Sequence, residues 1–199
     1  MDKLFFEKPS LERKDEIIEF LDEFIKYNSN INGSGSLDSI YRGSTFEEAL
    51  DRCYKMEDEE YAKSINKCPG KTFLLIREED NRIVGTINIR WNLTDALKKF
   101  GGNIGYGIRP TERRKGYNKI NLYLGLIEAQ KLGLDKVMLD CDVENLGSDK
   151  TIRALGGVLE RCELDPSDNE LTNVYWINVD ESIEKYKDVY GQNISKKIK

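Results

Sequence analysis

The stretch GYGIRPTERRKGYN at residues 105–118 decides the fold of this chain. Its first part is apolar and ends at Arg109 and Pro110, and proline cannot extend the hydrogen-bond ladder of a strand. A basic turn with Gly116 follows, and an apolar helical pattern begins directly after it. Such a turn leaves backbone N–H groups free at the helix start, where the helix dipole also favours anions. The stretch therefore predicts a strand, a diphosphate-binding turn and a helix, with an ordinary basic loop as the alternative.

Periodic apolar patterns continue on both sides of this stretch. Alternation predicts strands at residues 4–7, 72–77, 82–91, 103–108, 136–141, 158–163 and 173–179. Helical spacing predicts helices at 11–27, 45–56, 116–131 and 145–155, and Thr45 with Glu48 predicts a capping box at the second of them. The first helix is expected to bury Ile17, Ile18, Leu21, Phe24 and Ile25. With no linker rich in Pro, Gly or Ser, we expect one domain over 1–199: a mixed α/β sheet with helices on its faces and a tail at 191–199.

The composition excludes several classes of function. The 199 residues contain 31 Lys and Arg against 36 Asp and Glu, and the net charge of −5 argues against a nucleic-acid binder. The chain has no histidine, so it has no Ser-His-Asp triad, no histidine base and no zinc site built on imidazole. No apolar stretch approaches the roughly 20 residues that cross a bilayer. We therefore expect no nucleic-acid partner, no membrane insertion and no metal.

Cysteine and glycine spacing exclude further motifs. The four cysteines form no C-x-x-C pair and the first residues contain no apolar signal segment, so we expect reduced thiols and a cytoplasmic location. The sequence G-x-x-x-x-G-K-[ST] of nucleotide phosphate loops does not occur. Gly33-Ser34-Gly35 lacks the third glycine of a dinucleotide fingerprint and follows no predicted strand.

RRKGYN at residues 113–118, with the elements around it, resembles the GNAT superfamily of acetyl-CoA-dependent N-acetyltransferases. The pyrophosphate signature of that family is Q/R-x-x-G-x-G/A, and the segment matches all but its last position, which is Asn118. The family's asparagine that opens the helix after the next strand corresponds to Asn145, and its usual small residue to Ser148. The resemblance is specific over about residues 73–164. GGNIGYGIRP and RRKGYN are similar to a bacterial group of predicted acetyltransferases.

The resemblance implies a fold and a cofactor. The fold is a central, mostly antiparallel sheet that splays at the cofactor strand, with helices on both faces, a cofactor-binding core at about 72–164 and a helical wall for the acceptor at 11–66. The cofactor is acetyl-CoA, whose pantetheine arm would lie along the strand that ends at Ile108, while its diphosphate would meet the amides and cations of the basic turn. The implied cofactor-binding residues are Ile108, Arg113, Arg114, Lys115, Gly116, Tyr117, Asn118, Asn145 and Ser148. Helix capping is a second role for Asn145.

The proton donor departs from the family pattern. The family often sets a tyrosine seven residues after the helix asparagine, and this chain has Ile152 there. A thiol pKa near 8.5 makes the CoA thiolate a tolerable leaving group without an acid. Tyr106 or Tyr117 are substitute donors, although packing is the more common role of such aromatics.

The proton acceptor is also unassigned. Many family members place a base near the start of the cofactor strand, where this chain has Gly102 and Asn103, and neither can take a proton. Three carboxylates near the end of the strand at 136–141 are candidates, with a solvated acidic cluster as the alternative: Asp140, Asp142 and Glu144. Cys141 without a histidine to activate it is expected to be a buried thiol rather than a nucleophile.

The resemblance predicts an N-acetyltransferase that moves acetyl from acetyl-CoA to a primary amine by direct attack in a ternary complex. The acceptor is an amine of a small molecule or peptide, and an acidic chain favours a cationic one such as a polyamine, an aminoglycoside or a lysine. The alternatives are a non-catalytic acyl-CoA-binding module of the same fold and a transferase for another acyl group, such as succinyl. We expect a monomer or a homodimer.

Overall fold

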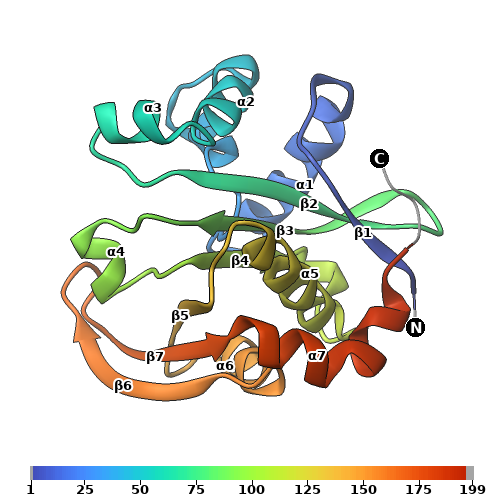
Figure 1. Cartoon of the computed structure of the whole chain (residues 1–199). Coiled ribbons are helices and arrows are strands. Elements are labelled where there is room, and N and C mark those ends of the chain that lie inside the picture. The colour runs from blue at the N-terminus through green and yellow to red at the C-terminus, as the bar shows by residue number, and fades with distance from the viewer. Residues whose placement is uncertain (1, 196–199) are drawn as a thin grey trace.

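The computed structural model describes residues 2–195. Its first sheet has four antiparallel strands in the order β1-β2-β3-β4 (Figure 1). These are β1 (Leu4–Glu7), β2 (Gly70–Arg77), β3 (Arg82–Arg90) and β4 (Ile104–Ile108). The hairpin of β2 and β3 confirms the prediction of two strands joined at residues 78–81, and β4 is the strand expected to hold the cofactor.

A second antiparallel sheet has the order β5-β7-β6. It consists of β5 (Lys136–Asp142), β6 (Val158–Asp165) and β7 (Glu170–Asn178). The two sheets meet beside the start of β4, where the Asn103 amide donates to the Met138 carbonyl at 2.7 Å and the Met138 amide donates to the Asn103 side-chain oxygen at 2.8 Å. No other backbone hydrogen bond joins β4 to β5 within residues 2–195. The predicted splay at β4 is confirmed, and the sheet divides in two because the strands part after this contact.

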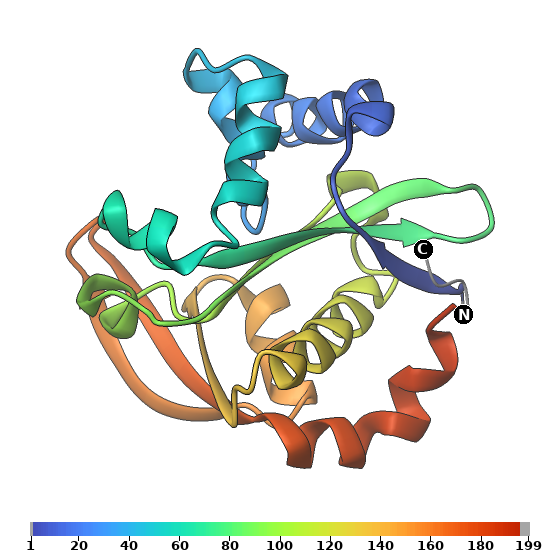
Figure 2. The ribbon, with the colours of Figure 1, turned by 45° about the horizontal axis from the view of Figure 1, so that its top comes forward.

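The N-terminal helices cover one face of the first sheet (Figure 2). They are η1 (Leu11–Arg13), α1 (Lys14–Lys26), η2 (Leu37–Arg42), α2 (Phe46–Lys55) and α3 (Glu59–Ser64). The predicted capping box of Thr45 and Glu48 opens α2. The buried face of α1 is Ile17, Phe20, Leu21 and Phe24. Ile25 was expected there but is 56% exposed, since it lies about 100° around the helix from Phe24.

The other face of the first sheet packs on α5 (Tyr117–Lys131), which lies between this sheet and the C-terminal helix α7 (Val179–Tyr190; Figure 1). Alternation along β2 divides the core: Leu74 and Ile76 join the cluster under α1, whereas Leu75 joins the cluster with α5. The helix is apolar around most of its circumference, which is typical of a helix covered on several sides. Two helices, α6 (Leu146–Ala154) and α7, flank the second sheet.

The C-terminal segment differs from the prediction of a tail at 191–199. After the unpredicted α7, the turn η4 (Gly191–Asn193) leads to Ile194, which forms a parallel bridge with Leu4, and the Ser195 amide donates to the Leu4 carbonyl at 2.8 Å. Residues 191–195 are therefore part of the fold, and positions 196–199 of the expected tail lie outside the described residues. A short helix, α4 (Asp95–Lys99), also lies between β3 and β4. Among the helices of residues 2–195, none has the length and apolar character of a membrane span.

Candidate functional site

The basic turn before α5 exposes unpaired backbone amides. Arg114 and Gly116 both have left-handed backbone angles, with φ of 65° and 83°. Within residues 2–195 the amides of residues 114–118 donate no hydrogen bond. Successive free N–H groups at a helix start form a concave site for an anion, and the helix dipole adds to the attraction. The local geometry is therefore that of an oxyanion-binding turn.

This turn opens onto a cavity of about 810 Å³ between β4 and the start of α6. Eight of the nine residues predicted to bind the cofactor line it: Ile108, Arg113, Arg114, Gly116, Tyr117, Asn118, Asn145 and Ser148. Lys115 is not among the lining residues, because its ammonium bonds Glu112 at 2.7 Å. The Asn118 amide nitrogen reaches Thr151 at 3.4 Å, and its buried oxygen has no partner within the described chain.

The cations of the turn differ in what they bind. Arg113 donates to the Ile108 carbonyl at 3.1 Å and to the Ser29 hydroxyl at 2.7 Å, and its guanidinium lies 5.7 Å from the centre of the Phe24 ring. It therefore ties the end of β4 to the loop after α1. Arg114 is exposed on the cavity wall and has no ion pair within residues 2–195.

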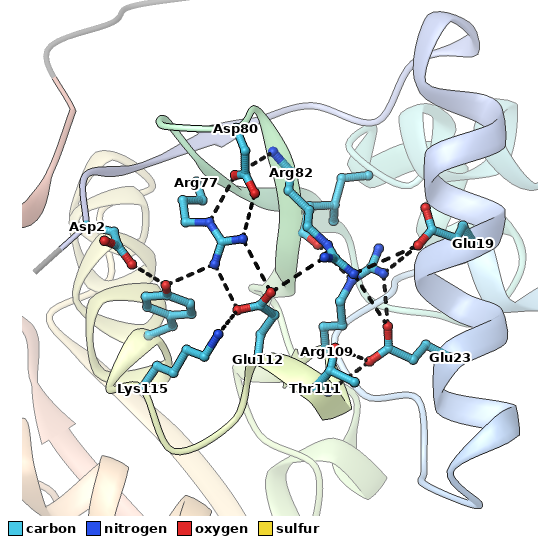
Figure 3. Close-up of polar contacts among 12 residues, drawn as sticks. Asp2, Glu19, Glu23, Arg77, Asp80, Arg82, Arg109, Thr111, Glu112 and Lys115 are labelled. Atoms are coloured by element: carbon cyan, nitrogen blue, oxygen red, sulfur yellow. Dashed lines mark hydrogen bonds and ion pairs between the residues drawn. The ribbon is translucent and has the colours of Figure 1, made fainter.

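Behind the turn, an ion-pair network fixes its position (Figure 3). Glu112 is 4% exposed and accepts from Arg77 at 2.8 Å as well as from Lys115. Burial favours the neutral carboxyl, but these two cations outweigh it and hold the pKa of Glu112 below its ordinary value. The buried Arg109 binds Glu23 at 2.9 Å, and Glu23 in turn accepts from the amide of Thr111 at 2.8 Å. The turn is thus anchored to β2 and α1 before any ligand binds.

A second cavity, of about 740 Å³, adjoins the first. Besides two residues of the loop after α1, the cavities share four lining residues: Tyr106, Asp142, Asn145 and Ser148. The second cavity is lined by five aspartates, at positions 38, 140, 142, 165 and 168, and by three cations, Arg42, Arg90 and Lys99. The two cavities therefore meet at these four residues.

Tyr106 lies at this junction. Its hydroxyl is buried and has no hydrogen-bond partner within residues 2–195. Burial raises the pKa of Tyr106 well above its ordinary value, although the nearby Ser148 hydroxyl acts in the opposite direction. The phenol therefore stays protonated and can donate to a group in the junction. Tyr117 does not share this position, because its hydroxyl bonds Arg77 at 3.1 Å and also Asp2.

The predicted acids separate in the structure. Burial, together with Asp168 and Asp165, raises the pKa of Asp142 at the junction. Asp140 lines the second cavity and accepts from the Gly101 amide. Glu144 is exposed and lines neither cavity. Among the candidate bases, Asp142 alone lines both cavities.

Three other positions singled out in the sequence have structural roles in the fold. Asn145 accepts from the Ser148 amide at 3.1 Å, which is its helix-capping role. Ile152 is fully buried in the core, so the position of the family's tyrosine has no polar group. Burial raises the pKa of Cys141 to about 12, so its thiol is protonated at neutral pH, as expected for an inert cysteine.

The loop after α1 lines both cavities, and the sequence pattern did not reveal this position. Asn30 and Asn32 line both cavities. Gly33 packs directly on β4, where a Cβ would lie 2.5 Å from the Cα of Tyr106, and the Thr86 hydroxyl donates to its carbonyl at 2.9 Å. Glycine is required here because two backbones touch and φ is +76°.

Comparison with known families agrees with this geometry. The family model described as "Acetyltransferase (GNAT) family" matches residues 36–156, which is more than half of the chain.

The chain belongs to the GNAT acetyltransferase family. It is accordingly an acyltransferase, and acetyl-CoA is its cofactor. No sequence among curated proteins matches it.

Solved structures share the GNAT fold at low sequence identity. The ribosomal alpha-N-protein acetyltransferase RimL, in complex with coenzyme A, is 16% identical with a TM-score of 0.61, over 89% of this chain and 96% of that one. A GNAT-family acetyltransferase from Bacillus anthracis is 18% identical with a TM-score of 0.57, over 90% and 97%. Spermidine N-acetyltransferase from Vibrio cholerae, in complex with CoA and spermine, is 14% identical with a TM-score of 0.56, over 91% and 98%.

Proposed function

We propose that the protein transfers an acetyl group from acetyl-CoA to a primary amine by direct attack in a ternary complex. The observation that carries the proposal is the junction of two cavities at Tyr106 and Asp142, one with an anion-binding turn and the other lined by carboxylates. Two reactants held on either side of one point react without a covalent enzyme intermediate. The buried, protonated Cys141 agrees with this, since it is a poor nucleophile.

The residues present fit CoA in the first cavity. The unpaired amides of 114–118 and the exposed guanidinium of Arg114 suit a diphosphate. The edge of β4 that faces the splay pairs with no strand after Asn103 within the described residues, so it can hydrogen-bond an extended pantetheine amide. The unpaired oxygen of Asn118 and the side chain of Asn145 are further polar groups on that wall. When bound, acetyl-CoA supplies the thioester whose acetyl group forms the new amide.

The family resemblance implied that Arg113, Arg114 and Lys115 all bind the diphosphate, and we propose different roles for the three. Arg114 contacts the phosphates, whereas Arg113 and Lys115 hold the loop after α1 and the turn in place. Lys119 and Lys150 also line the cavity, and we propose that they attract the remaining phosphate charge of the cofactor. No sequence motif pointed to these two lysines, since they belong to helix starts on two separate elements.

Proton transfer in the proposed reaction uses the two groups at the junction. The amine arrives as an ammonium ion, and Asp142 takes its proton, since a carboxylate with a raised pKa is a stronger base at neutral pH. The nitrogen then forms the amide bond as the C–S bond breaks. Tyr106 would donate its proton to the departing sulfur. The nitrogen would lose its second proton as the amide forms, and this proton would restore Tyr106 through solvent, while the proton on Asp142 would pass to solvent. The acceptor cavity, with five aspartates, favours a cationic amine.

Calorimetric titration tests the cofactor, with acetyl-CoA as ligand and NAD and ATP as controls. Saturable micromolar binding of acetyl-CoA alone is expected. A panel of primary amines with acetyl-CoA and succinyl-CoA then tests the transfer, with acetylated amine and free thiol formed in equal amounts. Binding without transfer to any amine would favour an acyl-CoA-binding module, and faster transfer from succinyl-CoA would assign another acyl group.

A further inference from the structure

Arg90, at the end of β3, is a cation of the acceptor cavity that uses few of its hydrogen-bond donors within the described chain. Its only side-chain hydrogen bond within residues 2–195 runs from Nη2 to the Gly101 carbonyl at 2.8 Å, and it forms no ion pair there. Its Nε is buried and unpaired. A buried donor without an acceptor is costly, and Nε of Arg90 has lost water without gaining one. This position is therefore expected to receive an acceptor group from a ligand.

The surroundings of Arg90 explain why the protein does not neutralise it. The ionisable groups whose charge reaches Arg90 are Cys68 and Asp140. Burial raises the pKa of Cys68, so its thiol is neutral at physiological pH. Asp140 accepts from the Gly101 amide, while Arg90 donates to the carbonyl of the same residue. Gly101 thus bonds both residues, and Asp140 attracts Arg90 without forming an ion pair with it.

Arg90 is also placed where a ligand can reach it. It lines the acceptor cavity and a smaller cavity of about 290 Å³, which also contains Thr72 and Asn88. Asp140 and Asp142 point to the same side of β5, about 7 Å apart along the strand. The cavity therefore has carboxylates leading to the junction and a guanidinium at its other side.

We propose that Arg90 binds a carboxylate of the acceptor, so that the acceptor carries both a primary amine and a carboxylate, as an amino acid does. This inference rests on the proposed acetyl transfer, which places the amine at the junction. It distinguishes the acceptor from a simple polyamine, for which an unpaired cation in the cavity is repulsive. The guanidinium fork suits a carboxylate because two parallel N–H groups meet its two oxygens.

Matched pairs of amines that differ only in the carboxylate test the proposal. The pairs are glycine and methylamine, lysine and cadaverine, and phenylalanine and phenethylamine. Each compound is titrated calorimetrically into the CoA-bound protein and is also assayed for acetylation. We expect the carboxylate-bearing member of at least one pair to bind about tenfold more tightly, or to react with about tenfold higher kcat/KM. Equal or better binding and turnover of the decarboxylated members throughout would overturn the proposal.

Variants separate recognition from stability. Arg90→Gln is expected to remove the preference for the carboxylate by weakening binding of the carboxylate-bearing member without weakening that of its decarboxylated partner, and Arg90→Lys to retain part of the preference. Arg42→Gln removes the same charge from the exposed rim, where Arg42 already pairs with Asp38 at 2.7 Å, and should keep the preference. An equal loss for both members of a pair in Arg90→Gln would show a structural role and contradict the proposal. Carboxylate binding without acetylation of any amine would refute the transfer but retain the subsite.

Discussion

The side chain of Asn103 joins the two sheets: its oxygen accepts from the Met138 amide at 2.8 Å and its nitrogen donates to the Arg90 carbonyl at 3.0 Å. Asn103 is 6% exposed, so both partners are shielded from water. In the family pattern this position often carries a base, and here it holds the point where the two sheets part. A residue that cannot take a proton thus has a clear structural task.

Asn103→Ala should lower the free energy of unfolding by about 1–3 kcal/mol, since it leaves a buried amide and a buried carbonyl unpaired. Denaturant titration of the variant and the wild type measures the difference. A loss below about 0.5 kcal/mol would show that water or a rearranged backbone replaces the side chain.

Gly116→Asp should abolish CoA binding while the protein stays folded. The substitution places a negative charge beside the free amides of the turn, where the diphosphate is proposed to lie. Gly133→Asp is the matched control, because Gly133 has a similar φ of +75° at the other end of α5, and a Cβ added there would meet no atom within 4 Å. Calorimetry with CoA compares the two. Normal affinity in Gly116→Asp would remove the turn from the cofactor site.

Tyr106→Phe should lower kcat roughly 10²-fold with little change in CoA affinity, since a proton donor contributes about that factor. The hydroxyl has no partner within the described chain, so its removal breaks no hydrogen bond there and should leave stability nearly unchanged. Tyr54→Phe, which removes a hydroxyl bonded to the Pro9 carbonyl, serves as the control. An unaltered kcat in Tyr106→Phe would show that the CoA thiolate leaves without a proton from Tyr106.

Asp142→Asn should lower kcat/KM about 10²-fold and remove the acid limb that this carboxyl gives to the pH profile. Burial and the neighbouring carboxylates raise the pKa of Asp142, so in the wild type the loss of activity begins above the ordinary aspartate value of about 3.9 as the pH falls. Both proteins are compared with the same amine, so that the titration of the amine cancels. Glu144→Gln, at an exposed position outside both cavities, should keep the wild-type profile. A Glu144→Gln profile without the acid limb would transfer the role to Glu144.

Glu112→Gln should destabilise the protein by about 1–3 kcal/mol at neutral pH, because Arg77 loses its buried partner and keeps only the more exposed Asp80 as a counter-ion. The folded-state pKa of Glu112 lies below the unfolded value, so the ion pair stabilises the protein above the unfolded pKa and this contribution is lost as the pH falls through the folded pKa. The difference in free energy of unfolding between wild type and variant should therefore be smaller at pH 3 than at pH 7. An equal difference at the two pH values would assign the effect to packing.

Local patterns predicted the elements that have strong apolar periodicity. The alternation in β2 and the apolar run of α5 follow from burial, and the turn before α5 was found from its charge and its glycine. The helix α7 was missed because its buried contacts, from Val179 to Tyr190, lie among six charged residues and depend on packing against α5. Ile25 shows the same limit, since only the tertiary arrangement decides which edge of an apolar stripe is covered.

The candidate site was predictable where chain neighbours form it and not where distant segments do. Residues 113–118 are contiguous, so the turn could be read from the sequence. The hydrogen bonds of Arg113 with Ser29 and of Lys115 with Glu112 could not be predicted from the sequence, since net charge does not determine where a side chain points. Nothing in the strand sequence RIVGTINIR marks Arg90 as a candidate site residue. Only the fold shows that Arg90 forms no ion pair within residues 2–195.

The loop after α1 makes the two ligands thermodynamically dependent on one another. Asn30 and Asn32 line both cavities, so a molecule in either one alters the freedom of the same two residues. Whatever factor CoA contributes to the affinity for the acceptor, the acceptor must contribute the same factor to the affinity for CoA. If binding of the first ligand orders this segment, the loss of conformational entropy falls on that first binding step. The second ligand then binds without this cost, so the two bind cooperatively with no movement of the sheets.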